Sequence, residues 1–318
     1  MTHNRARGTA LVLAASLFSA SSGPLAKQAM AAGLTPHQVV SVRISLAAIL
    51  LTVGLAIFRP SLLRVRAADW RVLLGFGLFG VAGVQAMYFI AVSRLPVGIA
   101  MLLEFTAPVL VALWVRFVRG THLPAKAWAG TALALLGLAM VAQVWEGLRL
   151  DVVGLLAGIG AALCAACYFL IGEHGLTTRH PLTMATYGMI VGAVAVAAVL
   201  TPLWTLPGET LAKATPTGPV WTVLIEIAVF STVIAYILGM SALRHLPSNV
   251  VSVLSLAEPV IAAAAAWALL NERLTVIQII GGLTLLAGAF LVQRASQPSV
   301  GPQLHPKTDD MEPVAPRS

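Results

Sequence analysis

The chain contains ten long apolar segments, and this feature constrains its fold more than any other. Each is near the length of about 20 residues that a helix needs to cross a bilayer. Each is also apolar around its whole circumference, as a helix embedded in lipid must be. The segments are 9–31, 38–58, 71–92, 97–118, 126–145, 152–172, 182–204, 219–243, 248–269 and 275–293. We therefore predict an all-α polytopic membrane protein with ten transmembrane helices.

Charge supports a membrane protein and sets its orientation. Only 10% of the 318 residues are charged, against roughly 25% in an ordinary soluble domain, which argues against a soluble enzyme or a disordered protein. Of the 20 Lys and Arg residues, 14 fall on the side of the N-terminus, 4 on the other side and 2 within spans. This bias predicts that both termini are cytoplasmic. It also explains the net charge of +8 without a nucleic-acid partner.

The two halves of the chain repeat each other at an offset of 151 residues. The aligned pairs that carry most weight are Pro108 with Pro259, Gly130 with Gly281 and Gly137 with Gly288, because both residue types control the backbone. Five spans per half is an odd number, so the second half enters the membrane from the opposite side. We predict a 5+5 inverted-topology repeat, typical of secondary transporters although channels share it. The repeats cover 9–145 and 152–293, and a disordered, proline-rich cytoplasmic tail covers 295–318.

Charged residues within the spans are the first candidates for function. Each costs roughly 2.5–3.5 kcal/mol at the centre of a bilayer on the insertion scale. They are Lys27, Arg43, Glu104, Glu226 and Glu258, with Glu173 near the end of a span. Internal pairing or a place at the interface explains Glu173 best. For Lys27 and Glu226 a functional and a structural role are equally open.

Two prolines predict breaks in the helices that carry the acidic residues. Proline removes the hydrogen bond to the carbonyl four residues earlier, so Pro108 frees the carbonyl of Glu104 and Pro259 frees that of Ser255. Broken helices near the midplane are where transporters bind substrates and ions. The alternative is a packing kink filled by neighbouring helices.

A set of polar residues is predicted to line the path between the helices. They are Gln85, Tyr88, Tyr236, Ser252 and Ser255. The guanidinium of Arg43 suits a carboxylate in bidentate geometry, and its partner is either a substrate carboxylate or one of the carboxyl groups of Glu104 and Glu258. Glu104 is also predicted to bind substrate, and either Glu104 or Glu258 would carry a coupling proton. The sequence holds no cluster of metal ligands, so no metal is predicted. No catalytic residue and no cofactor are predicted either.

Two motifs resemble those of the EamA family in the drug/metabolite transporter superfamily. Ala257-Glu258-Pro259, followed by Asn271-Glu272-Arg273-Leu274-Thr275, is similar to the family's Glu-Pro…Gly-Glu-x-Leu-Thr pattern, with Asn271 in place of glycine. In the first half, the stretches 96–100 and 103–108 resemble the family's threonine/homoserine exporter branch, although Ala107 stands where many members have glutamate. The resemblance implies a secondary active transporter of the bacterial inner membrane. It would export small amino acids or related metabolites by proton antiport.

Several alternatives remain open at this point. The same fold could serve drug or other metabolite efflux, or uptake, and a passive channel is a further reading. An intramembrane disulfide oxidoreductase using Cys164 and Cys167 is less favoured, because such enzymes generally need further cysteines and this chain has only these two. The partners predicted for a transporter, which is not an enzyme, are a small-molecule substrate and the lipid bilayer. A homodimer is left open.

Overall fold

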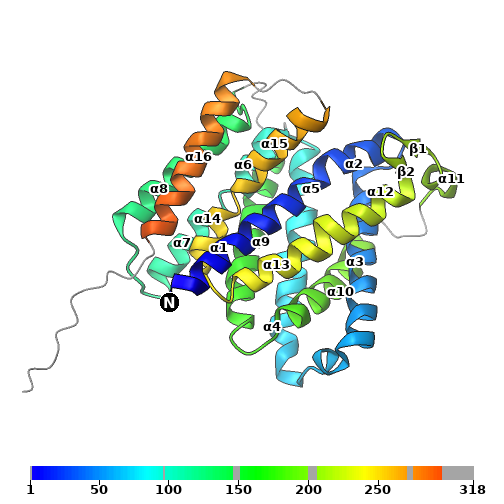
Figure 1. Ribbon diagram of the computed structural model, residues 1–318, viewed down its shortest axis with the longest axis horizontal. Helices are drawn as coiled ribbons and strands as arrows, with labels where there is room; N and C mark the ends of the chain where they lie inside the picture. The colour runs from blue at the N-terminus through cyan, green and yellow to red at the C-terminus, as the bar shows by residue number, and fades with distance from the viewer. Residues whose placement is uncertain (1, 96, 146–150, 200–205, 271–274, 296–318) are drawn as a thin grey trace, which may run out of the picture.

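The protein is a bundle of helices, as the sequence predicts. The computed structural model describes residues 2–95, 97–145, 151–199, 206–270 and 275–295, and nearly all of them are helical (Figure 1). Each of the ten predicted apolar segments is helical over most of its described length. A two-stranded antiparallel ladder joins β1 (Ala214–Thr215) to β2 (Gly218–Pro219). The predicted tail lies outside the described residues, apart from Ala295.

Many of the predicted spans consist of two or three consecutive helices. The first half contains α1 (Thr2–Ala20), α2 (Ser22–Ala31), α3 (Pro36–Phe58), the short turns η1 (Pro60–Leu63) and η2 (Ala67–Asp69), α4 (Trp70–Gly75), η3 (Phe76–Gly83), α5 (Val84–Val92), α6 (Val97–Glu104), α7 (Ala107–Phe117) and α8 (Ala125–Val141). The second half contains α9 (Val152–Gly175), α10 (Pro181–Val199), α11 (Gly208–Leu211), α12 (Val220–Glu226), η5 (Ile227–Ile234), α13 (Ala235–Ala242), α14 (Ser248–Leu254), α15 (Ala257–Leu270) and α16 (Val276–Ala295).

Within this described part, seven helical runs are long and apolar enough to cross a membrane. Three further apolar helices are shorter, namely 125–141, 248–262 and 276–292. The prediction of a polytopic helical membrane protein agrees with these lengths.

Local sequence explains where several helices begin. At the start of α3, the amide of Gln38 donates to Thr35 Oγ1 (3.3 Å) and the amide of Thr35 donates to Gln38 Oε1 (2.9 Å), which is a reciprocal capping box. Thr275 and Gln278 repeat this arrangement before α16, with the same two distances. At α9, Asp151 Oδ1 accepts a 2.7 Å bond from the amide of Gly154.

Two π-helical segments occupy equivalent places in the two halves. η3 begins at Phe76 and η5 at Ile227, which is the offset of 151 residues seen in the sequence. In a π-helix each amide bonds to the carbonyl five residues earlier, and such segments are frequent at functional sites. The hydroxyl of Thr232 also donates to the carbonyl of Ile227, five residues earlier (3.1 Å). The hydropathy pattern gives no sign of either segment.

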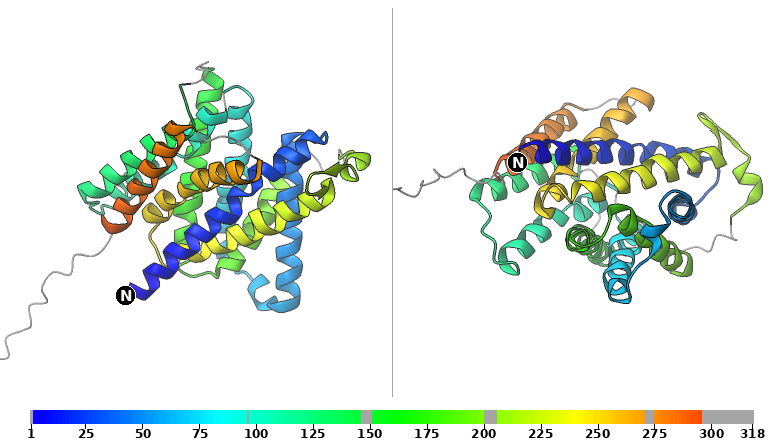
Figure 2. Two further views of the ribbon diagram at one scale, coloured as in Figure 1. Left: turned by 45° about the horizontal axis from the view of Figure 1, so that its top comes forward. Right: turned by 60° about the horizontal axis from the view of Figure 1, so that its bottom comes forward.

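Helix α9 packs against helices from both halves of the chain, while an apolar face that includes Leu156 and Leu163 is exposed. It packs against α5, η3, α6, α7 and α14. Glycines allow this close approach: a Cβ on Gly158 would lie 2.5 Å from Leu103 Cδ1, and one on Gly80 would lie 3.1 Å from the Cα of Tyr168. On one side of the bundle, α1 and α2 run alongside α12, η5 and α13 (Figures 1 and 2).

Four glycines form a tight seam between α8 and α16, which lie side by side (Figures 1 and 2). A Cβ on Gly130 would lie 2.8 Å from the carbonyl oxygen of Gly288, and one on Gly137 would lie 2.5 Å from that of Gly281. Residues with higher numbers on α8 therefore contact residues with lower numbers on α16, so the two helices are antiparallel. These are the glycines that the sequence repeat aligns, and we call them the glycine seam.

The glycine seam should be intolerant of any side chain. We expect Gly137→Val to lower the free energy of unfolding by about 1–3 kcal/mol or more, because its side chain would collide with the backbone of α16. Thermal unfolding in detergent would measure this. Gly54→Ala on α3 is the matched control, since nothing lies within 4 Å of a Cβ there. It should be neutral or stabilise by up to about 1 kcal/mol, and an equal loss in both variants would contradict the seam.

Candidate functional site

Two broken helices carry the acidic residues singled out from the sequence. In the first half, α6 ends at Glu104 and α7 begins at Ala107. In the second half, α14 ends at Leu254 and α15 begins at Ala257, with Glu258 in its first turn. Pro108 and Pro259 lie in the first turns of α7 and α15. The breaks therefore lie just before the two prolines, and the two halves break at equivalent places.

The second break differs in detail from the expectation. The carbonyl of Ser255 is not free, because it accepts a 3.0 Å bond from the amide of Glu258 in a tighter turn. The hydroxyl of Ser255 donates to the carbonyl of Val251 (2.9 Å), and that of Ser252 donates to the carbonyl of Asn249 (3.2 Å). Both serine hydroxyls therefore donate their hydrogen bonds to backbone carbonyls of their own helix. They can still accept a bond from a ligand.

The structure brings the predicted charges together from three elements. Glu104 interacts electrostatically with both Glu258 and Arg43, and Glu258 also interacts with Arg43. Both carboxyl groups are partly buried. Arg43, on α3, has a buried Nε without a hydrogen-bond partner. A guanidinium with a donor to spare, within electrostatic range of two carboxyl groups, offers the charges that a zwitterion needs.

Three tyrosines lie within electrostatic range of these charges in the described part of the chain. Tyr88 interacts electrostatically with Glu104 and Glu258, and Tyr236 interacts with these two residues and with Arg43. Sequence reasoning missed a third tyrosine, Tyr168 on α9. Its ring packs edge-on against that of Tyr236, with 5.6 Å between centroids, and it interacts with Glu258. The signal for Tyr168 was a lone phenol in a span of mostly small and aliphatic residues.

A third helix break lies beside Glu258, and sequence reasoning missed it too. α1 and α2 are separated by a turn at Ser21. Just before that turn, Ser19 Oγ donates to Glu258 Oε1 (2.7 Å). The hydroxyl of Ser21 lies 2.8 Å from that of Ser231 in η5. The available signal was the group Ser19, Ser21 and Ser22, followed by Gly23 and Pro24.

The remaining predicted residues lie around the edge of this site. Gln85 is partly buried on α5, and its equivalent in the second half is Tyr236, 151 residues later. Among the described residues no hydrogen bond joins Gln85 to the carboxyl groups. Lys27 and Glu226 are exposed on the neighbouring helices α2 and α12. The motif residues 271–274 and Pro96 lie outside the described residues.

Comparison with known proteins identifies the family. The model of the EamA-like transporter family matches residues 6–143 and 152–294. The chain belongs to this family. It is 29% identical over 285 residues to the threonine/homoserine exporter RhtA of Salmonella typhimurium, which covers 88% of this chain and 89% of the relative. RhtA of Escherichia coli K12 is 29% identical over 257 residues, covering 79% and 80%.

More distant relatives agree on the general role and on the fold. The uncharacterized transporter YyaM of Bacillus subtilis is 25% identical over 291 residues, covering 88% of this chain and 91% of the relative. A solved crystal structure superposes with a TM-score of 0.74 at 18% identity and covers 92% of this chain and 100% of that chain. This EamA-like protein is therefore a multi-pass membrane transporter.

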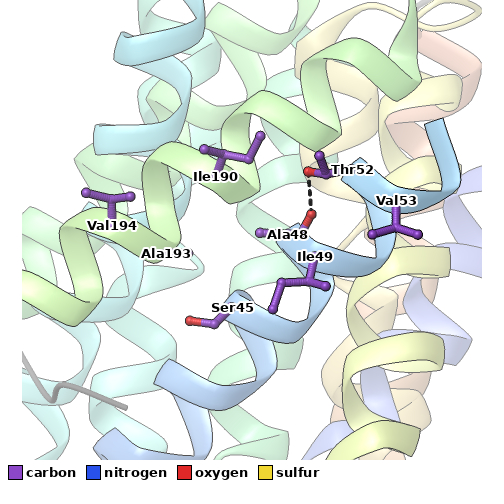
Figure 3. Close-up of a pocket in the computed structure, with 8 residues that line it drawn as sticks. All are labelled: Ser45, Ala48, Ile49, Thr52, Val53, Ile190, Ala193 and Val194. Carbon is purple, nitrogen blue, oxygen red and sulfur yellow. Dashed lines mark hydrogen bonds between the residues drawn. The ribbon is translucent and has the colours of Figure 1, made fainter. Parts of the chain in front are cut away.

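This EamA-like fold has a groove on its surface whose lining includes no charged residue. It has a volume of about 430 Å³ and lies between α3 and α10 (Figure 3). Its walls are Ser45, Ala48, Ile49, Thr52, Val53, Ile190, Ala193 and Val194. The hydroxyl of Thr52 donates to the carbonyl of Ala48 (2.6 Å), so the lining is mainly apolar. None of the predicted site residues lines this groove.

Glu173 ties the second broken helix to α9. Its carboxylate accepts bonds from the amide (3.0 Å) and the hydroxyl (3.1 Å) of Ser248, the first residue of α14, and it pairs with Arg119. Ser248 is completely buried. This agrees with the internal pairing expected for Glu173. At the other end of α9, Asp151 and Arg94 form an exposed pair at 3.6 Å.

Removing the Glu173 carboxylate should destabilise the fold more than breaking the exposed pair. We expect Glu173→Ala to lower the free energy of unfolding by about 1–3 kcal/mol, because the buried donors of Ser248 lose their acceptor. Arg94→Ala is the control and should change it by at most about 1 kcal/mol, as exposed pairs do. Denaturant unfolding in micelles would compare the two. A smaller loss for Glu173→Ala than for Arg94→Ala would contradict this account.

Proposed function

We propose that this protein is a secondary active transporter that exports small hydroxylated amino acids, such as threonine and homoserine, in exchange for protons. The observation that carries the proposal is the electrostatic interaction among Arg43, Glu104 and Glu258, the two glutamates lying at the two helix breaks before Pro108 and Pro259. Charged groups inside a membrane protein mark substrate and ion pathways. The name of the relative RhtA supports this class of substrate.

We assign Arg43 to the substrate carboxylate and the two glutamates to the ammonium group and the coupling proton. The unpartnered Nε of Arg43 supports the first assignment, because a buried donor gains most from a charged acceptor. Two carboxyl groups next to one guanidinium leave one negative charge in excess, which a proton or an ammonium group can neutralise. Gln85, Tyr88, Tyr236, Ser252 and Ser255 would line the path.

The same proposal includes ten spans in a 5+5 inverted repeat, with both termini in the cytoplasm of a bacterial inner membrane. The glycine seam supports it: Gly130 meets the repeat equivalent of Gly137, and Gly137 meets that of Gly130. A two-fold axis between the halves produces such reciprocal contacts. Since α8 and α16 are antiparallel, that axis would lie in the plane of the membrane. The equivalent π-helices and the two matches of the family model support it as well.

Other uses of the same fold remain as outcomes of the tests. Uptake in place of export would reverse the direction of net flow, and a drug or another metabolite would replace the amino acid. A channel would not concentrate its substrate against a gradient. A homodimer would change neither the site nor the coupling.

Replacing Glu104 should uncouple transport from protons without unfolding the protein. In proteoliposomes loaded with labelled threonine or homoserine, we expect a proton gradient to drive exit from the wild type. The gradient-driven rate of Glu104→Gln should be at least about tenfold lower than that of the wild type, because the amide cannot release a proton. Glu226→Gln, which changes an exposed glutamate on α12, is the matched control and should keep the rate. Normal gradient-driven exit in Glu104→Gln would remove Glu104 from the mechanism.

The two cysteines should be dispensable. Both are partly buried and free on α9, and a Cβ on Gly83 would lie 2.9 Å from Cys164 Sγ, so this thiol packs closely against η3. The double variant Cys164→Ala, Cys167→Ala should export at the wild-type rate in the same vesicles. Loss of transport in that variant, with its thermal unfolding unchanged, would favour the oxidoreductase alternative.

A further inference from the structure

One hydrogen bond joins the broken helix α1–α2 of the first half to an acidic residue of the second half, Glu258. Ser19 lies in the last turn of α1, two residues before the turn that separates α1 from α2. Its hydroxyl donates to Glu258 Oε1 at 2.7 Å, across 239 positions of sequence. Glu258 itself lies in the first turn of α15, just after the break that follows α14. The bond therefore connects two helix breaks directly.

The other contacts of this helix end are neutral. The hydroxyl of Ser21 donates to the carbonyl of Phe18 (2.7 Å) and lies 2.8 Å from that of Ser231. The ring of Phe18 stacks on that of Phe230, with 6.1 Å between centroids. None of these groups changes charge at physiological pH. Among the described contacts of residues 18–21, the bond from Ser19 is the one that ends on a group able to take up a proton.

The chemistry of a carboxyl group makes this bond dependent on protonation. An ionised carboxylate only accepts hydrogen bonds, whereas a protonated carboxyl group also carries an O–H donor. When a proton binds to Glu258, the charge-assisted bond from Ser19 becomes a weaker neutral one or is replaced. A serine hydroxyl in a helix has an alternative acceptor in the carbonyl four residues earlier, here that of Ala15. The proton stays on the carboxyl group, and apart from the O–H bond that it forms there no covalent bond is made or broken.

We propose that Ser19 is a positioning residue that links proton binding at Glu258 to the position of the broken helix α1–α2. This inference rests on the proposed function. The ionised carboxylate of Glu258 holds the end of α1 against α15, and the protonated form releases it. Among the described residues, the other titratable or charged groups that interact with Glu258 come from five elements. They are Arg43 on α3, Tyr88 on α5, Glu104 on α6, Tyr168 on α9 and Tyr236 on α13.

The test is the pH profile of homoserine exit from proteoliposomes for wild type, Ser19→Ala, Ser19→Thr and Ser21→Ala. Without its donor, the charged form of Glu258 is less stable and binds its proton more readily. We expect Ser19→Ala to move the midpoint of the profile to about tenfold lower proton concentration. Ser19→Thr keeps a hydroxyl group and should restore the wild-type midpoint. Ser21→Ala removes the neighbouring neutral contact and should leave the midpoint in place.

A second measurement does not depend on transport. The pH dependence of thermal unfolding in detergent should change in Ser19→Ala and stay as in wild type in Ser21→Ala. If Ser19→Ala does not transport, this profile decides between linkage and misfolding. If the pH profile of unfolding in Ser19→Ala is the same as in the wild type, and wild-type exit depends on pH, the role of Ser19 is overturned and the proposed function stands. Absence of any pH-dependent amino-acid exit in the wild type would overturn the proposed function, and this inference with it.

Discussion

The need to satisfy every backbone polar group inside a bilayer governs this structure. A regular helix satisfies these groups internally, whereas a break exposes them and is tolerated only where protein or a water-filled cavity surrounds it. In the part of the chain that the structure describes, three such breaks lie between α1 and α2, between α6 and α7, and between α14 and α15. Side chains of residues at or next to these breaks include Glu104, Glu258 and Ser19, so the irregular backbone and the charges occupy the same place.

Amino-acid composition and spacing predicted the helices well because burial in lipid leaves a strong signal. The start of α3 could be read from Thr35, Pro36 and Gln38, which cap a helix within four residues of sequence. The break before Pro259 was predictable for the same local reason, but the bond from the amide of Glu258 to the carbonyl of Ser255 was not, because it depends on the exact turn. The π-helices likewise depend on a small shift in hydrogen bonding that hydropathy does not record.

Contacts between residues that are distant in the sequence limit how much of the site could be predicted from the sequence alone. Arg43, Glu104 and Glu258 stood out because a charge in a span is rare in any sequence. Ser19 and Tyr168 carry no charge, so their sequence signals, a group of serines and a lone phenol, are weaker. Their importance comes from the positions of Glu258 and Tyr236, which only the fold brings near them. The sequence repeat gave more information about contacts between distant residues than the composition of single spans did, because the glycines that it aligned meet in space.

The two halves are similar in backbone but differ in where they place their acids. The equivalent of Glu104 in the second half is Ser255, and that of Glu258 in the first half is Ala107, so the two carboxyl groups are not exchanged by the repeat. Their surroundings differ accordingly, because Glu258 accepts a bond from Ser19 and begins a helix, whereas Glu104 ends one. A carboxylate is more stable in the first turn of a helix than in the last. The repeat thus supplies two equivalent breaks, and the unequal acids give those breaks different electrostatic roles.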